Sequence, residues 1–217
     1  MSVTLTPTKP TRRVVYPTSD GKPMAETDLH IDLIAYCRDA LRAYFLPRAN
    51  EVYVSGNNFV FFRQGDPTAK ISPDCYVVFG AAQRPRDSFK CWEEDGRLPS
   101  VVFEFTSKKT RNEDVGEKLL RYESLRVPEY FLFDPKGEYL QPALRGYRLT
   151  PLGMYAPIAP DAQGHLHSEQ LGLVLVQENR RLRLLDSLTG EPLRSAAEAE
   201  AEITRLRAEL ERLRGAI

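Results

Sequence analysis

The sequence has few of the residues that build disulfide-bonded, zinc-bound or membrane-spanning structures. Its 217 residues include only three cysteines, which are widely spaced and lie among apolar neighbours. We therefore expect reduced thiols in the core and neither disulfides nor a zinc site. No apolar stretch approaches membrane-spanning length, and the N-terminus lacks the basic-then-apolar order of a secretory signal. These absences predict a soluble cytoplasmic protein with no membrane partner.

An excess of charge of either sign is also missing. The chain has 30 Lys and Arg residues and 30 Asp and Glu residues, so its formal net charge is zero. This balance argues against a strongly basic, non-specific nucleic-acid binder. A nuclease is not excluded, because metal ions neutralise phosphate locally. The local basic cluster of Lys108, Lys109 and Arg111 is a candidate DNA contact, although most such clusters are solvated surface.

Two carboxylates stand within strongly apolar runs. Asp74 lies in the run 71–79, and Glu104 lies in the run 101–106. Such runs are typical of strands covered on both faces, where an unpartnered carboxylate is costly to bury. Two acids on neighbouring buried strands can bind Mg²⁺ or Mn²⁺ through hard oxygen ligands. The alternative is that each acid is ion-paired or lies at a solvated strand end.

A polar turn after the Glu104 run leads into a predicted helix. Thr110 and Glu113 form a capping-box signature, so we expect the helix to begin near Arg111. Recurring every four residues along one stripe of this helix are Asp114, Lys118 and Tyr122. The stripe can return the lysine ammonium to the end of the preceding strand. The alternative is an ordinary Asp114–Lys118 pair on a solvated helix face.

The order of these motifs resembles the Uma-two-type restriction endonuclease family, a bacterial branch of the PD-(D/E)XK nuclease superfamily. The matching segments are Ser72-Pro73-Asp74, residues 103–107, the 114/118/122 stripe, residues 128–135 and an opening segment at 19–30. The resemblance implies a Mg²⁺-dependent or Mn²⁺-dependent phosphodiesterase that acts on DNA. Asp74 and Glu104, helped by the backbone carbonyl of Phe105, would hold the metal, which would activate a water and polarise the scissile phosphate.

The chain departs from the superfamily pattern at its lysine. That pattern places a lysine two residues after the strand acid, on the same face of the strand. Here the position is Thr106. The branch that this chain resembles takes its lysine from the following helix, which makes Lys118 the expected catalytic lysine. Lys108 has the right parity and is the alternative.

Three further residues are candidates to support this centre. The hydroxyls of Ser107 and Tyr122 can orient a carboxylate or a phosphate oxygen. The first helix of PD-(D/E)XK folds often contributes an acid near the metal, so Glu26 is a plausible extra ligand. The preference for acids in the first turn of a helix is the competing explanation for Glu26. His30, four residues later, is interpreted as a structural residue.

Periodicity predicts the elements around the centre. We expect a helix from about 25 to 45, strands at 51–55 and 59–63 joined by a hairpin-like turn at 56–58, the Asp74 and Glu104 strands, the Lys118 helix, and a strand at 130–133. This is the αβββαβ order of the restriction-endonuclease-like core. Antiparallel hairpins at 144–158 and 173–185 would add to it. A polar insertion at about 81–98 holds Trp92, which we expect to be partly buried against the core, with a surface anchor as the alternative. The expected fold class is α/β, with a mixed sheet flanked by helices.

The C-terminal residues change character. Apolar side chains recur there at alternating steps of three and four residues, at Ala196, Ala199, Ile203, Leu206, Leu210, Leu213 and Ile217. This heptad seam of about three repeats is explained by pairing with a second copy or by packing on the domain, and we interpret it as a coiled-coil oligomerisation helix. We expect residues 1–195 to form the nuclease-like domain and residues 196–217 to form a helix that pairs two copies. A symmetric dimer would set two active sites against the two strands of a duplex.

A second function class competes with the nuclease. A nuclease-fold protein that has lost cleavage would serve as a binding or assembly module through its coiled coil. Thr106 at the usual lysine position and the zero net charge favour this alternative. The set of Asp74, Glu104 and Lys118 disfavours it, because three costly polar positions are hard to explain as scaffold alone. A glycosidase fits poorly, since no sugar-stacking aromatic pattern lies beside the acids.

Overall fold

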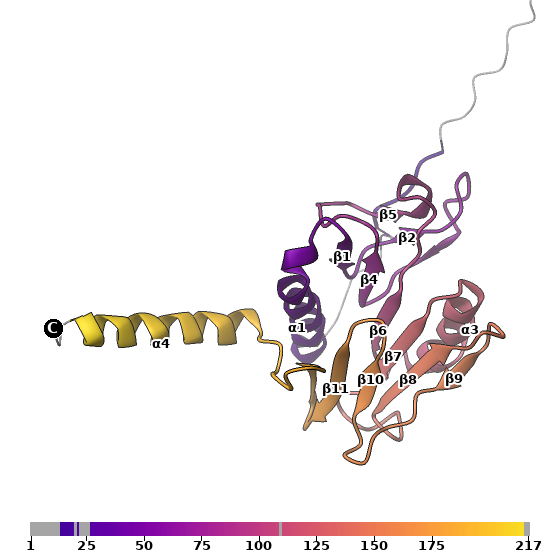
Figure 1. Ribbon diagram of the computed structural model, residues 1–217. Helices are drawn as coiled ribbons and strands as arrows, with labels where there is room; N and C mark the ends of the chain where they lie inside the picture. Colours follow the sequence, from indigo (N-terminus) through magenta and orange to yellow (C-terminus); the bar gives the residue numbers. More distant parts are fainter. Residues whose placement is uncertain (1–13, 20, 22–26, 109, 215–217) are drawn as a thin grey trace, which may run out of the picture.

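A mixed sheet occupies the centre of the protein. The computed structural model describes residues 14–19, 21, 27–108 and 110–214 (Figure 1). Within this part of the chain, a six-stranded sheet has the order β1 (Val52–Ser55), β4 (Cys75–Phe79), β6 (Val101–Phe105), β7 (Glu129–Phe133), β8 (Leu144–Leu149) and β9 (Tyr155–Pro157). Strands β6 and β7 are parallel, and the other neighbours are antiparallel. The expected fold class, with the αβββαβ core order, is confirmed.

Helix α1 (Asp28–Tyr44) covers one face of the sheet. Its N-cap is Thr27, whose hydroxyl accepts a hydrogen bond from the His30 backbone N–H. The side chains that α1 buries are Leu33, Ile34, Cys37, Ala40 and Leu41, at the helical spacing that the sequence predicts. They pack on inward residues of β1, β4 and β6 and on a second sheet of β10 (Leu166–Ser168), β11 (Leu173–Glu178) and β12 (Arg181–Asp186).

Helices α2 (Arg111–Val115) and α3 (Glu117–Ser124) lie on the other face (Figure 1). The predicted start at Arg111 is right, but the expected single helix is broken at Gly116, whose φ of −110° and ψ of −88° are not helical. The expected capping box is also wrong. The Thr110 hydroxyl makes no capping bond and accepts a hydrogen bond from the Ser107 N–H. The break at Gly116 makes α3, which carries Lys118 and Tyr122, a separate helix from α2.

The hairpin expected at 56–58 is wrong. Strand β1 pairs with β4, whereas β2 (Val60–Phe61) joins β3 (Lys70–Ile71) and β5 (Phe89–Lys90) in a separate small sheet. Gly56 explains the different path, because a Cβ at this position would overlap the Asp74 backbone carbonyl. A residue without a side chain lets the chain cross closely over the start of β4 and leave the main sheet. The Asn57 N–H donates to the Pro73 carbonyl at this crossing.

Several smaller features fill in the fold. The two predicted C-terminal hairpins form as β8–β9 and β11–β12, whereas β10 and the short helices η1 (Leu46–Arg48) and η2 (Cys91–Glu93) were not expected. Trp92 is half-buried, as predicted, with its ring centroid 5.1 Å from that of Tyr16. All three cysteines are buried and free, so the expectation of core thiols is confirmed. Among the described helices, none is long and apolar enough to cross a membrane.

The last helix, α4 (Ala196–Arg214), extends away from the body of the protein (Figure 1). Its N-terminus carries a reciprocal capping box, in which the Ser195 N–H donates to Glu198 and the Glu198 N–H donates to the Ser195 hydroxyl. Arg183 of β12 pairs with Glu198 at 3.0 Å, which ties the start of the helix to the second sheet. No residue of the described helix is buried.

Candidate functional site

Asp74 immediately precedes strand β4, and Glu104 lies in the neighbouring strand β6. Cys75 of β4 pairs with Phe103 of β6 in antiparallel register, so the next step of the register sets Asp74 opposite Glu104. The Asp74 Oδ2 atom accepts a hydrogen bond of 2.8 Å from the Phe105 N–H. Burial raises the pKa of Glu104 and the Asp74 charge adds to this effect, so the two acids that were expected at one centre lie close enough to interact.

The Glu104 carboxylate is fully buried, and two side chains from α3 reach it. The Lys118 Nζ lies 3.0 Å from Oε2, and the Tyr122 hydroxyl donates to Oε1 at 2.5 Å. Strand alternation explains the direction of Glu104, because Val102 and Glu104 point to the α2–α3 face while Phe103 and Phe105 point to α1. The helical stripe therefore meets the strand acid, as the sequence predicts.

Lys118 also lies beside a second buried carboxylate. Its Nζ is 2.9 Å from Oδ1 of Asp114, whose side chain is 1% exposed. The contact lacks hydrogen-bond geometry, and both Asp114 oxygens have no hydrogen-bond partner within the described part of the chain. One ammonium thus serves two buried carboxylates. We regard this contact as an ion pair, since charge attraction at 2.9 Å does not depend on a good donor angle.

The titration of the centre reflects this crowding. Burial raises the pKa of Glu104 well above its usual value, and the nearby Lys118 ammonium only partly counters the effect. Burial also raises the pKa of Asp114. Burial would lower the pKa of Lys118, but attraction to Glu104, Asp114 and Asp74 outweighs burial and raises it. The centre therefore has more carboxylates than cations, and an added positive charge would relieve the cost.

The donor set fits a divalent cation with oxygen ligands. Mg²⁺ is commonly held by one or two protein carboxylates, with waters and phosphate oxygens completing its shell. Asp74 and Glu104 supply that number of carboxylates. Among the described residues, no group of three or more His, Cys, Asp or Glu side chains is arranged to hold a metal by itself. The fit is therefore to a cation that shares its coordination between protein, water and substrate.

His30 is a neighbour of this centre that the sequence analysis interpreted as structural. Its Nε2 atom lies 3.5 Å from Asp74 Oδ2, and its ring meets the Phe105 ring edge-on at 6.2 Å. His30 and Asp74 are too far apart in the sequence for any local spacing pattern to predict their contact. Only the packing of α1 on the sheet brings the two residues together.

The other predicted site residues lie around the loop after β6. The Ser107 hydroxyl pairs with the Thr110 hydroxyl at 3.1 Å and makes no described bond to Asp74 or Glu104. Lys108 and Arg111 are exposed, and the Arg111 guanidinium lies 5.6 Å from the Tyr139 ring centroid. Glu26 and Lys109 lie outside the described residues.

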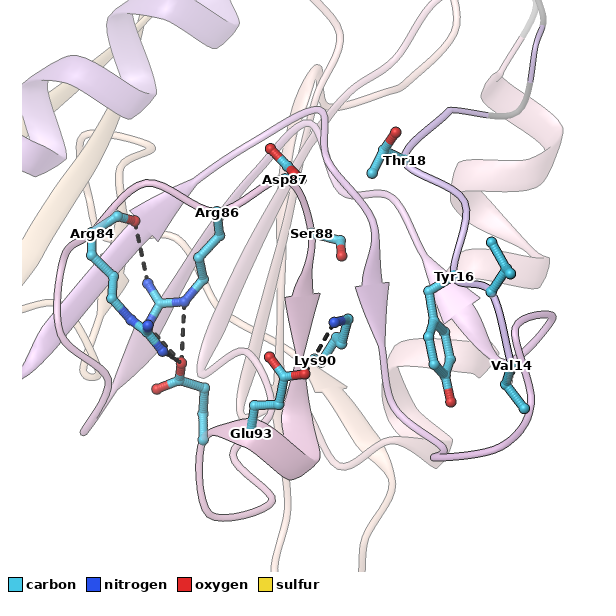
Figure 2. Close-up of a pocket in the computed structure, with 11 residues that line it drawn as sticks. Val14, Tyr16, Thr18, Arg84, Arg86, Asp87, Ser88, Lys90 and Glu93 are labelled. Carbon is cyan, nitrogen blue, oxygen red and sulfur yellow. Dashed lines mark hydrogen bonds and ion pairs between the residues drawn. The ribbon is translucent and has the colours of Figure 1, made fainter. Parts of the chain in front are cut away.

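A surface cavity lies apart from the Asp74–Glu104 centre. It measures about 510 Å³ and is lined by residues that include Tyr16, Arg84, Arg86, Lys90 and Glu93 (Figure 2). Its cations are neutralised within the cavity. Glu94 pairs with Arg84 at 2.6 Å and with Arg86 at 2.7 Å, and Lys90 pairs with Glu93 at 3.0 Å. This cavity therefore lacks the unbalanced charge that distinguishes the Asp74–Glu104 centre.

A family model and a solved structure are similar to this chain. The family model "Uma2: Putative restriction endonuclease" matches residues 8–184. A crystal structure from Anabaena variabilis, described as "a putative nuclease belonging to DUF820", is 18% identical and has a TM-score of 0.46. The similarity covers 71% of this chain and 81% of that one. No curated protein matches the chain.

Proposed function

Because this chain belongs to the Uma2 family of restriction endonucleases, we propose that it hydrolyses phosphodiester bonds in DNA with the help of a divalent cation. The observation that carries the proposal is the contact between Lys118 and Glu104, next to Asp74. Glu104 contacts Lys118 directly and the Asp74 charge acts on both, although Asp74 and Lys118 lie 44 positions apart in the sequence.

Asp74 and Glu104, with the Phe105 carbonyl, are the proposed ligands of Mg²⁺ or Mn²⁺. When bound, the cation would activate a water as nucleophile and polarise the scissile phosphate. Tyr122 orients the Glu104 carboxylate through its hydroxyl, and a fixed carboxylate binds a cation better than a mobile one. His30 lies beside Asp74, as Tyr122 lies beside Glu104.

Lys118 is proposed to stabilise negative charge on the phosphate. Its pKa is raised by the surrounding carboxylates, so the side chain keeps its proton at neutral pH. A lysine that stays protonated cannot act as a general base. It can stabilise the charge that develops on the phosphate oxygens during attack, and its ion pair with Asp114 fixes its position before the substrate arrives.

The remaining proposals concern DNA and assembly. The exposed Lys108 and Arg111, together with Lys109, would contact phosphates along the duplex. Helix α4 presents an exposed apolar stripe of Ile203, Leu206, Leu210 and Leu213. We propose that residues 1–195 are the nuclease domain and that residues 196–217 pair with the same helix of a second copy, which would supply one active site for each strand.

A cleavage assay with a matched acid control tests the proposed activity. Purified protein should nick or linearise plasmid DNA when Mg²⁺ or Mn²⁺ is added, and Asp74→Ala should abolish cleavage. Asp161→Ala, which removes an acid that pairs with His167 on another surface, should cleave like the wild type. A wild-type protein that cleaves neither plasmid nor linear DNA with either metal would favour the binding and assembly module.

A further inference from the structure

A smaller pocket opens beside the Glu104 centre. It measures about 280 Å³, and its lining includes Lys118 and Tyr122, the two side chains that bind Glu104. Lys70, which comes four residues before Asp74 in the chain, also lines the pocket. The pocket therefore adjoins the proposed catalytic centre and lies between helix α3 and the small sheet that contains Lys70.

Two cations in this pocket have no carboxylate partner among the residues that the structure describes. Lys70 is half-buried, and its Nζ lies 3.8 Å from the centroid of the Phe59 ring, close enough for a cation–π contact. Arg121 comes from α3 and is exposed. Neither cation forms an ion pair with any described residue, unlike Lys90 and Arg86 in the larger cavity. A cation that is held in place but not neutralised is available to an anion.

The pocket also has acidic residues, which restrict where an anion can lie. Glu113 and Glu117 line it from the α2 and α3 helices and are exposed. Glu117 and Arg121 are four residues apart on α3 and are therefore neighbours on its surface. An anion between Lys70 and Arg121 would be attracted by both cations and repelled by the two carboxylates. The two carboxylates therefore limit the part of the pocket in which an anion can bind.

We propose that Lys70, positioned by Phe59, and Arg121 bind the backbone phosphate that neighbours the scissile phosphate of the DNA strand. This inference rests on the proposed nuclease function. The ligand class is a phosphodiester, because the unpaired groups are an ammonium and a guanidinium, both of which bind phosphate oxygens. The role of Phe59 is to hold the ammonium, whose flexible stem would otherwise lose conformational entropy on binding.

Fluorescence anisotropy with a short labelled duplex, in metal-free buffer at several salt concentrations, tests the pocket without cleavage. Lys70→Gln and Arg121→Gln should each weaken binding by about tenfold. Each should also reduce the slope of log affinity against log salt by about one, as expected for one lost phosphate contact. Lys70→Arg should retain most of the affinity. Thermal unfolding of each variant should match that of the wild type.

Lys90→Gln is the matched control. Lys90 is also a lysine near an aromatic ring in the small sheet, but Glu93 already neutralises its charge. Its loss should leave binding unchanged. An equal effect of Lys70→Gln and Lys90→Gln would overturn the proposal, because the small sheet would then act only through general charge.

Phe59→Leu separates phosphate binding from base stacking. The change keeps the Lys70 charge, so it should weaken binding less than Lys70→Gln does. A larger loss from Phe59→Leu with an unchanged salt slope would indicate a stacked base and overturn the phosphate assignment. If the wild type cleaves DNA and Lys70→Gln binds like the wild type, only this inference fails. If binding depends on Lys70 but nothing is cleaved, only the proposed nuclease activity fails.

Discussion

Lys118 on helix α3 and Glu104 on strand β6 form an ion pair of 3.0 Å in which the carboxylate is fully buried. The pair joins the helix to the strand at the same place where Asp74 approaches from β4. Breaking such a pair leaves a buried charge without compensation, which typically costs about 3–5 kcal/mol. The residues proposed for catalysis are therefore also part of the structure that holds the sheet and the helix together.

Removing the lysine tests its catalytic role. Lys118→Ala should lower the cleavage rate by about a hundredfold or more, because the loss falls on the transition state. Cleavage is measured at saturating metal and DNA, and metal affinity is measured by calorimetry and should change little. Because the variant loses a buried ion pair, its unfolding temperature should fall, and cleavage is compared at a temperature where thermal unfolding shows the variant still folded. Lys108→Ala should only weaken DNA binding modestly, with a smaller salt dependence. A Lys108→Ala variant that fails to cleave, beside an active Lys118→Ala, would exchange the two roles.

Removing the proposed metal ligands tests the site itself. Mg²⁺ or Mn²⁺ should raise the unfolding temperature of the wild type, with a gain of about 2.7 kcal/mol at a metal concentration one hundred times the dissociation constant. Asp74→Ala/Glu104→Ala should show no such response. Equal metal binding by the double variant in calorimetry would show that the ion binds elsewhere.

The Tyr122 hydroxyl offers a finer test of the same centre. Tyr122→Phe removes one hydrogen bond to Glu104 and little volume, so stability should fall by about 1 kcal/mol. Metal affinity should fall by about tenfold, because the carboxylate loses the group that orients it. Tyr147→Phe, in the neighbouring aromatic cluster, is the control. Unchanged metal affinity in Tyr122→Phe would leave the tyrosine with a purely structural role.

Helix α4 is expected to control assembly. Deleting residues 196–217, or changing Leu210 to Glu in the exposed stripe, should shift the protein from dimer to monomer by light scattering. Arg207→Glu, which alters charge outside the stripe, should have a much smaller effect. The same mass for the deleted and full-length proteins would remove α4 from the assembly.

Acid should loosen the start of α4. Hydrogen bonds from Arg183 and from the Ser195 backbone lower the pKa of Glu198 from 4.5 to about 2. A carboxylate whose folded pKa lies below its unfolded value stabilises the fold above the unfolded value. Its contribution should therefore be complete above pH 4.5 and fade as the pH falls toward 2. The measurement is the pH dependence of helix content by circular dichroism, and Glu198→Gln should show a weaker dependence over this range.

Local sequence pattern predicted where the strands and helices of this protein lie better than it predicted which strands pair with one another. The apolar runs around Asp74 and Glu104 indicated buried strands, and four-residue spacing placed Lys118 and Tyr122 on one stripe, as the structure shows. The apparent hairpin at Gly56 was wrong, because the glycine allows the chain to cross over Asp74 and not to turn back. Such a crossing depends on a residue distant in the sequence.

Tertiary packing also determines contacts that local sequence pattern cannot predict. His30 lies beside Asp74 only because α1 packs on the sheet, and no local spacing links the two residues. The unpaired state of Lys70 is likewise invisible in sequence, since nearby acids such as Asp66 and Asp74 suggest available partners. Charge counts along a chain do not show which ions meet.

Lys118 has a consequence for how the protein is made. Small zinc domains stay unfolded until metal arrives, because metal binding supplies much of their folding free energy. Here a covalently attached ammonium already lies between Glu104 and Asp114. Part of the carboxylate charge is therefore compensated before any cation binds, so we expect the chain to fold in metal-free buffer.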